Sequence, residues 1–480
     1  MECYWEYIFR CINSLKEEFF WEETGRHSKD YIEEEIFKIT EVIRQHSLSD
    51  KLVGVCGASN IEQFILTVAC GLAGAVPCPV TVADLGEFTT DNTLDVVLTY
   101  ESNFTGACIN SIGANGPPGP VLSSAGVAMA FLTSGTSGSA RKIVFQSHSQ
   151  LFETQRAIID RMALPDGGVE LILTPFDNCY WFGRVRCSLS QGRSIITIGS
   201  PFNPLKAYKL IRDRHVTGVS CDSPAFEMIN NLAMEKGEEI FKGIEFLKVA
   251  SGPLNTNELL KFLDRNREVK FYFNYGLTEA MRCSILVLPE EMSKIGSVGR
   301  PLEGVNLSIL DIDSHITLPA GAYGEVATSG VHLSIGYNIA KDWESRFIGS
   351  EFKTGDYGYI DEDGYLYILG RASDILRYNG ITVHPALIEG QLYALLNQPF
   401  CVVGWEYETM PKKSGPLLVT EDRKFSQQKL HVINRFLESS FDTNHKLLGF
   451  AYLGKMPRTN NGKIKRAALL ESLRTIQVLI

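Results

Sequence analysis

FLTSGTSGSARK (131–142) opens with two apolar residues and continues as a run of serine, threonine and glycine that ends in two basic residues. Glycine lets backbone N–H groups approach a ligand, hydroxyls donate hydrogen bonds, and cations neutralise charge, so such a run after an apolar strand can wrap a polyphosphate. The spacing GxxxxGK[ST] of a Walker A loop is not met. The segment therefore predicts either a phosphate loop of another kind or a polar surface loop.

Apolar, strand-like runs alternate with helical stretches on both sides of this segment. This alternation predicts parallel sheets covered by helices. We expect the first 50 residues to be helical, followed by a buried helix at about 61–72. The expected strands of the α/β part lie at 51–59, 75–80, 94–100, 171–176, 194–199, 216–221, 246–252 and 270–276. Near residue 300 the pattern changes, and VNLSILDID (305–313), GEVATSG (324–330) and GYLYILG (364–370) favour short antiparallel strands.

The composition excludes several classes of protein. The chain has 480 residues, of which 44% are hydrophobic and 21% charged, and its net charge is 46 − 56 = −10. These values exclude disorder for most of the chain, and the acidic excess argues against a nucleic acid or an anionic membrane as the main partner. Phe64–Ala83 carries no charge, but glycines and prolines interrupt it, which favours a buried helix and strand over a membrane span.

The cysteines point to a reducing compartment. There are eleven, no two of them form a CxxC pair, and the nine histidines show no HExxH spacing. MECYWEYIFR at the start does not resemble a signal peptide. We therefore expect reduced thiols, no zinc site and a cytoplasmic location.

A second domain is expected after residue 374. Its 480 − 374 = 106 residues include strand-like FCVVGWEYE (400–408) and PLLVTED (416–422), a helical stretch at 426–439, and the basic loop KMPRTNNGKIKR (455–466). We expect one domain over residues 1–373 and another over 374–480.

Two further segments carry residues suited to chemistry. FYFNYGLTEA (271–280) places an aromatic ring, a hydroxyl and a carboxylate at the end of an expected strand. Ligands of α/β sheets bind at the carboxyl ends of the strands. FKTGDYGYIDEDGYLYILGR (352–371) places Asp356 and Arg371 at the two ends of an expected hairpin.

In this order and at these separations, the motifs resemble those of the adenylate-forming superfamily. That superfamily contains acyl-CoA synthetases, adenylation domains of nonribosomal peptide synthetases and firefly luciferase. The resemblance spans roughly residues 25–470, and the segments that carry it are TSGTSG (133–138), YGLTE (275–279), KTGD (353–356), GRASD (370–374) and PRTNNGK (457–463). It implies an α/β fold, with a large N-terminal domain of two α/β subdomains and a small β-barrel-like region, and a small, mobile α+β C-terminal domain.

The resemblance also implies ATP and Mg²⁺ as cofactors. The residues implied to contact ATP are Thr133, Ser134, Gly135, Thr136, Ser137, Gly138, Arg141, Lys142, Ser251, Gly252, Tyr275, Asp356 and Arg371. The implied catalytic residues are Thr278 at the α-phosphate, Glu279 as magnesium ligand and Lys463 bridging carboxylate and α-phosphate. Arg141 stands where the family commonly has lysine, and Lys142 could serve instead. Each of Thr278, Glu279, Asp356 and Lys463 could otherwise be an ordinary turn, cap or solvated residue.

The resemblance implies that Asp374 is the hinge between the domains and that Gly380 lines the tunnel for the thiol arm; Asp374 could also be a plain turn residue. TPFDNCYWFG (174–183) matches the segment that reads the acid. Asp177 there is a candidate to bind an amine, with Asn178 as the reader if the register differs by one. The other pocket candidates are Trp181, Ala225, Val249, Asn274, Arg282 and Cys283.

Two pocket candidates have alternative roles. Trp181 could equally be core packing. Arg282 could bind a second carboxylate of the substrate, pair with Asp177 or face solvent, because a buried arginine needs an anion.

The leading interpretation is a ligase that activates a small, amino-group-bearing carboxylic acid as acyl-AMP. It would transfer the acyl group to the phosphopantetheine of a separate carrier protein. The alternative is a CoA ligase for a small aryl or alkyl acid. A luciferase-like oxygenase and a non-catalytic nucleotide-binding protein are further alternatives. No nucleic-acid or membrane partner is expected.

Overall fold

The structure is a computed structural model. It describes the chain except for residues 1–2, 16–17, 23–24, 83, 85–93, 101–106, 111–125, 134–141, 200–201, 253, 379–380, 393–394, 397–398, 408–412, 441–445, 459–463, 475–477 and 480. The chain divides into two compact units. The first contains Met1–Thr133, Arg141–Leu307 and Thr328–Phe352, and the second contains Ser308–Ala327 and Lys353–Ile480. The expected domain boundary at residue 374 lies inside the second unit and stays a prediction.

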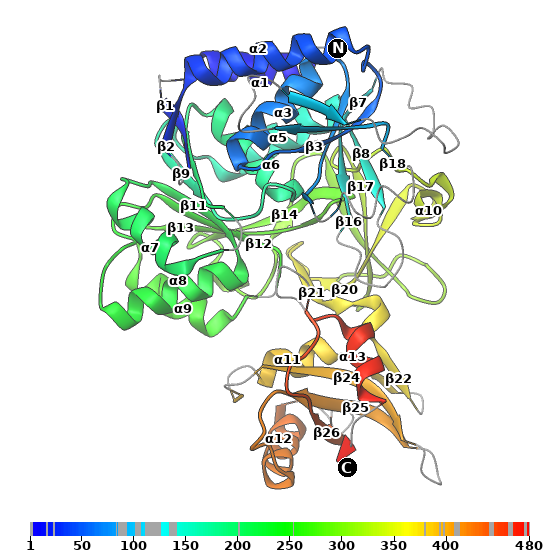
Figure 1. The fold of residues 1–480 in the computed structure, drawn as a ribbon. Coiled ribbons are helices and arrows are strands. Elements are labelled where there is room, and N and C mark those ends of the chain that lie inside the picture. The colour runs from blue at the N-terminus through cyan, green and yellow to red at the C-terminus, as the bar shows by residue number, and fades with distance from the viewer. Residues whose placement is uncertain are drawn as a thin grey trace. The chain divides into compact units, whose positions relative to one another are not determined.

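The first unit is built around a nine-stranded sheet (Figure 1). In spatial order its strands are β15 (Arg300–Pro301), β14 (Ala280–Leu288), β13 (Lys270–Leu277), β12 (Phe246–Ala250), β11 (Gly218–Asp222), β9 (Val169–Ile172), β10 (Ser194–Thr197), β1 (Glu18–Glu22) and β2 (Gly25–Ser28). The strands from β13 to β1 pair in parallel, whereas β14, β15 and β2 join their neighbours antiparallel.

Helices cover both faces of this sheet. They are α5 (His148–Met162) and α6 (Cys179–Ser190) on one face, and α7 (Pro204–Asp213), α8 (Ser223–Lys236) and α9 (Thr256–Arg265) on the other. The two-residue period of β13 decides which side chain meets which helix. Phe271 packs edge-on against Phe226 of α8, whereas the hydroxyl of Tyr272 donates to the carbonyl of Met162 in α5. Both faces of the sheet are thus buried, as its apolar strands require.

A smaller sheet in the same unit has the order β4 (Val76–Pro79), β3 (Leu52–Cys56), β5 (Val96–Tyr100), β6 (Ala107–Asn110). α3 (Asn60–Leu72) packs on this sheet, and α1 (Tyr4–Asn13) and α2 (Lys29–Gln45) pack on α3. α3 begins with a capping box, in which Ser59 and Glu62 satisfy each other's backbone N–H groups. The uncharged stretch after Phe64 is therefore most of α3 followed by β4. In the part of the chain that is described, no helix has the length and apolarity needed to cross a membrane.

Antiparallel strands follow in two groups. The order β18 (Gly336–Tyr337), β8 (Ile143–Ser147), β7 (Val127–Leu132) forms a three-stranded sheet. A second sheet has the order β16 (Val305–Leu310), β17 (Gly324–Gly330), β20 (Glu351–Ile360), β19 (Phe347–Ile348), with β21 (Leu366–Arg371) paired to β20. The short helices α10 (Ala340–Glu344), η1 (Met292–Lys294) and η2 (Ala372–Asp374) belong to this part of the sequence. Short strands after residue 300 were expected, and they are present.

The C-terminal part of the second unit has an α+β fold. It contains the hairpin β22 (Leu376–Tyr378) and β23 (Ile381–Val383), and the sheet β24 (Phe400–Tyr407), β25 (Lys413–Thr420), β26 (Gly449–Tyr452), β27 (Val478–Leu479). Its helices are α11 (Pro385–Leu392), α12 (Gln427–Ser440) and α13 (Arg466–Leu473). Alternate residues of β24 face opposite sides. Val402 packs in one hydrophobic cluster with Leu430 of α12, and Val403 packs in another with Leu469 of α13.

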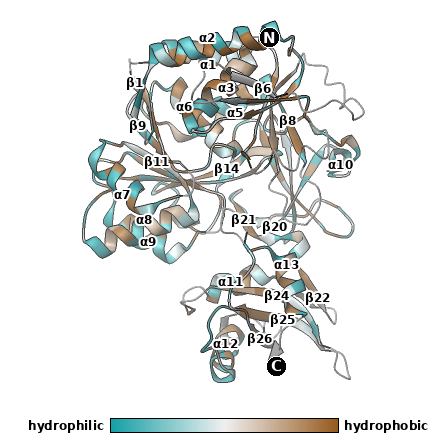
Figure 2. Cartoon of the chain, viewed as in Figure 1, coloured by the Kyte–Doolittle hydropathy of each residue, from teal (hydrophilic) through white to brown (hydrophobic). Residues whose placement is uncertain are grey.

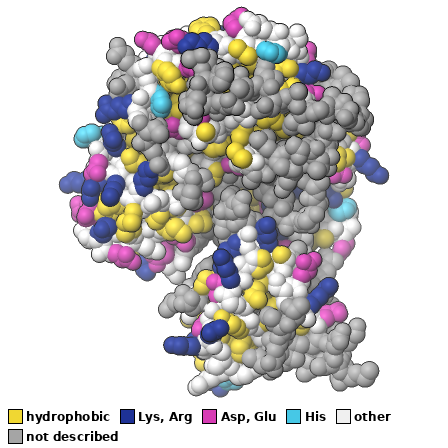
Figure 3. All heavy atoms as spheres, viewed as in Figure 1, with side chains coloured by type: hydrophobic (Ala, Val, Ile, Leu, Met, Phe, Trp, Pro, Cys, Tyr) yellow, Lys and Arg dark blue, Asp and Glu magenta, His cyan; other side chains and the backbone are white. Residues whose placement is uncertain are grey.

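The mixed α/β class with a larger N-terminal and a smaller C-terminal part is confirmed. One local prediction is wrong: the first 50 residues are not helical throughout, because β1 and β2 form a hairpin between α1 and α2. Hydropathy colouring shows largely apolar strands in the sheets and mixed polarity along α2 and α7 (Figure 2). On the face seen in the space-filling view, basic and acidic side chains are interspersed with apolar ones around α7–α9 (Figure 3).

Candidate active site

Several predicted site residues meet at the carboxyl ends of β11, β12 and β13. Asp222 pairs with Ala250 and Ala250 pairs with Asn274, so the residues after them lie along one edge of the sheet. Ser251 follows there with a left-handed φ of 64°, and the hydroxyl of Ser223 donates to the carbonyl of Gly252 over 3.3 Å. The predicted ATP contacts Ser251, Gly252 and Tyr275 and the predicted pocket residues Ala225, Val249 and Asn274 all belong to this edge. An edge of this kind is where α/β sheets bind ligands.

Thr278 and Glu279 form the turn between β13 and β14, which closes with the pair Leu277 and Ala280. The carbonyl of Thr278 accepts hydrogen bonds from Gln146 Nε2 (3.4 Å) and Ser334 Oγ (3.2 Å). The backbone N–H of Ser334 donates to the carbonyl of Glu279 over 2.8 Å. Segments distant in sequence thus fix the backbone of this turn, so the side chains of Thr278 and Glu279 project from a rigid base.

The carboxylate of Glu279 is oriented by Tyr337. The Tyr337 hydroxyl donates to Glu279 Oε1 over 2.6 Å. Burial, reinforced by the nearby Glu279 charge, raises the pKa of Tyr337, so its hydroxyl stays protonated and acts as a donor. Oε2 of Glu279 has no hydrogen-bonding partner among the described residues. An oriented carboxylate with one oxygen available fits Mg²⁺, which takes one or two carboxylates together with phosphate oxygens.

Tyr337 is a functional candidate that was not predicted as one. It lies on β18, opposite Val144 of β8. Lys142 Nζ lies 5.0 Å from the centre of the Tyr337 ring and 2.8 Å from Asp342 Oδ2. GEVATSGVHLSIGY (324–337) resembles a family segment and ends at this tyrosine, so the sequence did contain a signal, but not for the contact with Glu279.

Two hydrogen bonds join the two ends of the expected phosphate loop. Thr133 N donates to the Lys142 carbonyl over 2.9 Å, and Lys142 N donates to Thr133 Oγ1 over 3.1 Å. The backbone bond continues the ladder of β7 and β8 by one step, and the bond to the hydroxyl reinforces it. The remaining loop candidates, Ser134, Gly135, Thr136, Ser137, Gly138 and Arg141, lie outside the described residues, as do Gly380 and Lys463.

The two predicted ribose contacts, Asp356 and Arg371, belong to the second unit and face each other across β20 and β21. Asp356 Oδ1 lies 3.2 Å from Arg371 Nε, and Arg371 Nη1 donates to the carbonyl of Thr354 over 3.3 Å. The Thr354 hydroxyl in turn donates to the carbonyl of Val326 over 2.8 Å. The side chain of Asp356 is largely buried beside the Arg371 guanidinium.

The predicted hinge residue Asp374 lies at the end of η2. Its Oδ2 is 3.1 Å from Arg466 Nη1, and Arg466 Nη2 donates to both carboxylate oxygens of Glu389 at 2.7 Å. Burial opposes the charge of Arg466, but the Glu389 and Asp374 carboxylates outweigh it and raise the arginine's pKa. Arg466 therefore ties the predicted hinge to α11.

The expected acid-reading segment forms the start of α6. Asn178 is its N-cap, and Asn178 Oδ1 accepts a hydrogen bond from Tyr180 N over 2.8 Å. This oxygen is thus engaged within the backbone, whereas Asp177 stands one residue before the cap and is partly buried. Cys179, directly after the cap, lies with its Sγ 3.8 Å from Thr278 Oγ1. The first turn of α6 is therefore in contact with the Thr278–Glu279 turn.

Trp181 and Asn274 each keep a buried polar atom without a partner in the described part of the chain. These atoms are Trp181 Nε1 and Asn274 Oδ1. Trp181 is 2% exposed and packs in the core of the first unit, and Asn274 Nδ2 donates to the carbonyl of Val249 over 3.1 Å. Trp181 is therefore part of the core.

Arg282 on β14 is 5% exposed and has a φ of 63°, a left-handed conformation that non-glycine residues rarely adopt. Its Cζ lies 4.5 Å from the centre of the Tyr180 ring. Nε and Nη2 are buried and make no hydrogen bond to a described residue, so Arg282 neither faces solvent nor pairs with Asp177. Burial lowers the pKa of Arg282, partly opposed by Tyr180 and Cys179.

The architecture defines an α/β protein in which the predicted site residues of the first unit gather at the carboxyl edge of its sheet. A sequence profile described as "AMP-binding enzyme" matches residues 81–338. The chain belongs to this family of adenylate-forming enzymes, whose cofactors are ATP and Mg²⁺.

Known relatives agree with this assignment. A 2-succinylbenzoate–CoA ligase of Bacillus pumilus is 27% identical over 342 residues, which are 70% of this chain and 67% of the relative. A 4-coumarate–CoA ligase-like protein of Arabidopsis thaliana is 24% identical, and the alignment spans 73% of this chain and 63% of that protein. The chain thus spans about two thirds of the length of the curated relatives it matches.

Solved structures share the fold. The amide bond synthetase McbA from Marinactinospora thermotolerans superposes with a TM-score of 0.81 at 19% identity, covering 98% of this chain and 99% of that chain. The Bacillus subtilis o-succinylbenzoate–CoA synthetase MenE, in complex with ATP and magnesium, gives a TM-score of 0.79 at 20% identity and the same coverage.

Proposed function

We propose that the protein activates a small, amino-group-bearing carboxylic acid with ATP and then transfers the acyl group to a phosphopantetheine thiol. The observation that carries this proposal is the Thr278–Glu279 turn. It lies at the carboxyl edge of the sheet, its backbone is fixed by Gln146 and Ser334, and its carboxylate is oriented by Tyr337. Such a turn meets the need of adenylation, in which two anions must be brought together.

In the first half-reaction an oxygen of the substrate carboxylate attacks the α-phosphorus of ATP, and pyrophosphate leaves. The Thr278 hydroxyl would donate to an α-phosphate oxygen, and Lys463 would bridge that phosphate and the attacking carboxylate. Glu279 would hold Mg²⁺, which supplies positive charge that neutralises the phosphates. Asp356 and Arg371 would bind the ribose hydroxyls, with Tyr275 stacked on the adenine.

In the second half-reaction the thiol sulfur attacks the acyl carbonyl carbon, and AMP leaves. Asp374 would act as the hinge that turns the small domain (374–480) between the two steps, with Gly380 lining the path of the thiol arm. The acceptor proposed from the sequence is a separate carrier protein. Coenzyme A is the second candidate acceptor, because the relatives from Bacillus pumilus and Arabidopsis are named CoA ligases.

Asp177 would bind the amine of the substrate. It precedes the N-cap of α6, whose first turn contacts Thr278 through Cys179. The side-chain oxygen of Asn178 is already used by the helix cap, which supports Asp177 rather than Asn178 as the reader.

The decisive experiment is ATP–pyrophosphate exchange across amino acids, β-amino acids, dicarboxylates, aryl acids and short fatty acids. Exchange that requires an amine-bearing acid and is lost in Asp177→Ala supports the proposal. Exchange with aryl or alkyl acids only would contradict both an amine-bearing substrate and the assignment of Asp177 as the residue that binds the amine. Loading of a holo carrier protein against free CoA, measured with the acid that is activated, then decides the acceptor.

Lys463→Ala provides a mechanistic control for the same assay. The variant should lose exchange but still make thioester from a preformed acyl-adenylate. Equal loss of both half-reactions would contradict the bridging role. A bulky residue in place of Gly380 should show the opposite pattern, with thioester formation reduced and exchange retained.

A further inference from the structure

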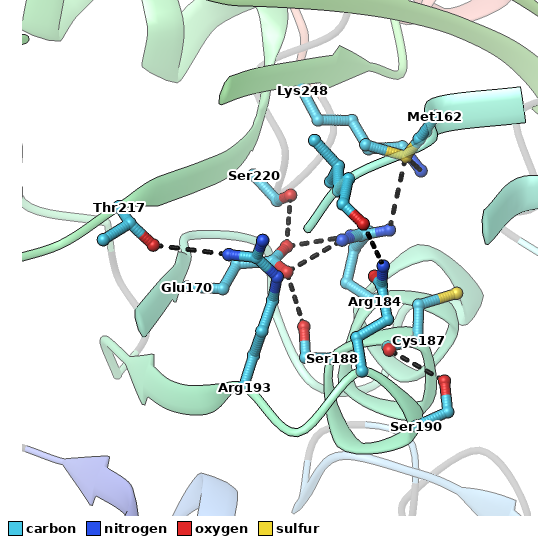
Figure 4. A network of polar contacts seen from close by, with 12 residues as sticks. Met162, Glu170, Arg184, Cys187, Ser188, Ser190, Arg193, Thr217, Ser220 and Lys248 are labelled. Carbon is cyan, nitrogen blue, oxygen red and sulfur yellow. Dashed lines mark hydrogen bonds and ion pairs between the residues drawn. The ribbon is translucent and has the colours of Figure 1, made fainter. Parts of the chain in front are cut away.

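The core of the first unit contains a buried guanidinium that is fully paired with a carboxylate. Arg184 on α6 is 1% exposed, and its Nε and Nη2 donate to the two oxygens of Glu170, each over 2.8 Å (Figure 4). Ser188 and Ser220 donate to the same carboxylate over 2.5 and 2.6 Å. A bidentate, fully hydrogen-bonded pair of this kind satisfies both buried charges.

Arg282 presents the same edge of its guanidinium with nothing bound to it. Its Nε and Nη2 are the two atoms that are buried and without a partner in the described structure. One face of the group is covered by the Tyr180 ring at 4.5 Å. A ring face stabilises a cation but does not accept the in-plane N–H groups, so the donating edge remains unsatisfied.

Neighbouring charges do not supply the missing anion. Arg184 lies near Arg282, and so does Lys248, a fully buried lysine on β12 whose Nζ donates to Met162 Sδ over 3.4 Å. Figure 4 shows Lys248 beside Arg184 and the Glu170 carboxylate already bound by its three partners. Burial lowers the pKa of Lys248, whereas Arg184 remains a cation and increases the cost of leaving Arg282 without a counter-ion.

Arg282 and Thr278 both lie against the first turns of α6. The first turns of α6 contact Thr278 at Cys179 and the Arg282 guanidinium at Tyr180. Gly183, one turn further along α6, lies close against Arg282, because a Cβ there would come within 3.2 Å of Nη2. Thr278 and Arg282 thus both contact the start of α6, which brings the proposed reaction centre and this guanidinium into one region of the first unit.

We propose that Arg282 binds a second carboxylate of the substrate, bidentately through Nε and Nη2, so that the acid activated is dicarboxylic. This inference rests on the proposed function and names its substrate class. A carboxylate has the planar, two-oxygen geometry that this edge of a guanidinium matches. An acid with an uncharged end would leave the edge unpaired and would bind less well.

The test compares dicarboxylic acids of three to six carbons with their half-amides, which match them in size and lack the second charge. The α-amino derivatives of both series are included, because Asp177 is proposed to bind an amine. The wild-type enzyme should use the best dicarboxylate on the order of 100-fold better than its half-amide, measured as kcat/KM in ATP–pyrophosphate exchange. Arg282→Met should bring this ratio close to one, and Arg282→Lys should keep part of it.

Arg186→Met is the matched control. Like Arg282, Arg186 is buried, but it lies on α6. It donates to the carbonyl of Leu151 and to Thr154 Oγ1. Its loss should lower stability and leave the ratio of dicarboxylate to half-amide unchanged. If Arg282→Met does not fold, the ratio of kcat/KM for dicarboxylate to that for half-amide in the wild type and in Arg282→Lys still tests whether Arg282 binds the second carboxylate.

Calorimetric binding of the dicarboxylates separates this inference from the proposed function. Exchange with half-amides at the same rate as with dicarboxylates would overturn the role of Arg282 and leave adenylation standing. Binding of a dicarboxylate that depends on Arg282, without exchange, would support Arg282 and overturn adenylation. Absence of both binding and exchange would overturn both.

Discussion

The hydroxyl of Tyr337 donates a 2.6 Å hydrogen bond to Oε1 of Glu279, although the two residues are 58 positions apart in sequence. Tyr337→Phe removes this bond and keeps the ring, which packs against Trp343 with centroids 5.1 Å apart. A hydrogen bond to a charged group contributes about 1.5–3 kcal/mol. We therefore expect ATP–pyrophosphate exchange to fall about 10- to 100-fold at limiting Mg²⁺.

The measurement for Tyr337→Phe is a magnesium titration of the exchange rate. If Tyr337 orients the magnesium ligand, the variant should need more Mg²⁺ for half-maximal rate and should recover in part at saturation. Trp343→Phe is a useful control, since it alters the packing of the Tyr337 ring but keeps the hydroxyl. A magnesium dependence identical to that of the wild type would assign Tyr337 to structure alone.

Substitution of Arg466 should affect hydrogen exchange differently from substitution of its ion-pair partner Asp374. Arg466→Gln breaks its ion pairs with Asp374 and Glu389, and the Glu389 contact is bidentate. Asp374→Ala leaves the Glu389 pair intact, and a partly exposed pair is worth at most about 1 kcal/mol. We expect Arg466→Gln to increase hydrogen exchange across α11 and β24, and Asp374→Ala to leave it nearly unchanged.

The same two variants separate stability from domain rotation. If Asp374 is the hinge, Asp374→Ala should change the ratio of adenylation to thioester formation while the fold remains stable. An unchanged ratio would make Asp374 a plain turn residue. A loss of exchange protection in Asp374→Ala as large as in Arg466→Gln would instead make it part of the folded core.

The elements that the sequence predicts well are those with a strong local pattern. The buried strands at 194–199, 246–252 and 270–276 are continuous apolar runs, and β10, β12 and β13 lie there. The hairpin β1–β2 was missed, because its strands are five and four residues long and lie among charged residues between two helices. Periodicity in so short a segment does not distinguish a strand from a helix.

Contacts within the candidate site were likewise predictable only where a local pattern decides them. The motifs predicted that Asp356 and Arg371 would act together, and they face each other across one hairpin, where local pairing decides the contact. The bond from Tyr337 to Glu279 depends on how β18 joins β8, which no local pattern specifies. Whether Arg282 is paired depends on every side chain around it, so the sequence could only leave alternatives open.

Removing Glu170 should destabilise the first unit strongly. Glu170→Gln leaves Arg184 buried without a counter-ion, which costs about 3–5 kcal/mol. Chemical denaturation followed by fluorescence measures the loss. The double variant Glu170→Gln, Arg184→Met should recover part of it, because no unpaired charge remains; a strictly additive double variant would show that the two residues do not act as a pair.

Glu170 should also contribute to acid sensitivity. Burial would raise its pKa, but the charge and hydrogen bonds of Arg184, with those of Ser188 and Ser220, outweigh burial and lower it. A carboxylate with a lowered pKa in the folded state stabilises the protein above its unfolded value of about 4.3, and this contribution is lost as the pH falls further. The difference in stability between wild type and Glu170→Gln should therefore shrink below about pH 4.

His332 should make the free energy of unfolding depend on pH at higher pH values than Glu170 does. Its side chain is fully buried, Nε2 lies 2.9 Å from Thr328 Oγ1, and Nδ1 has no partner among the residues described. Burial lowers its pKa to about 4, so the folded state holds it neutral while the unfolded chain protonates it near pH 6.5. Lowering the pH from about 6.5 to about 4 should then reduce the free energy of unfolding by about 3 kcal/mol.

His332→Gln tests this pH dependence, because glutamine keeps a hydrogen-bonding group toward Thr328 and does not titrate. The variant should lose stability at pH 7.5, yet its free energy of unfolding should change less than that of the wild type between pH 6.5 and pH 4. The comparison between the two proteins cancels the contribution of the other histidines, including His27 and His148, whose pKa values burial also lowers. Parallel curves for wild type and variant would mean that His332 has the same pKa in the folded and the unfolded protein, and would contradict the predicted effect of burial.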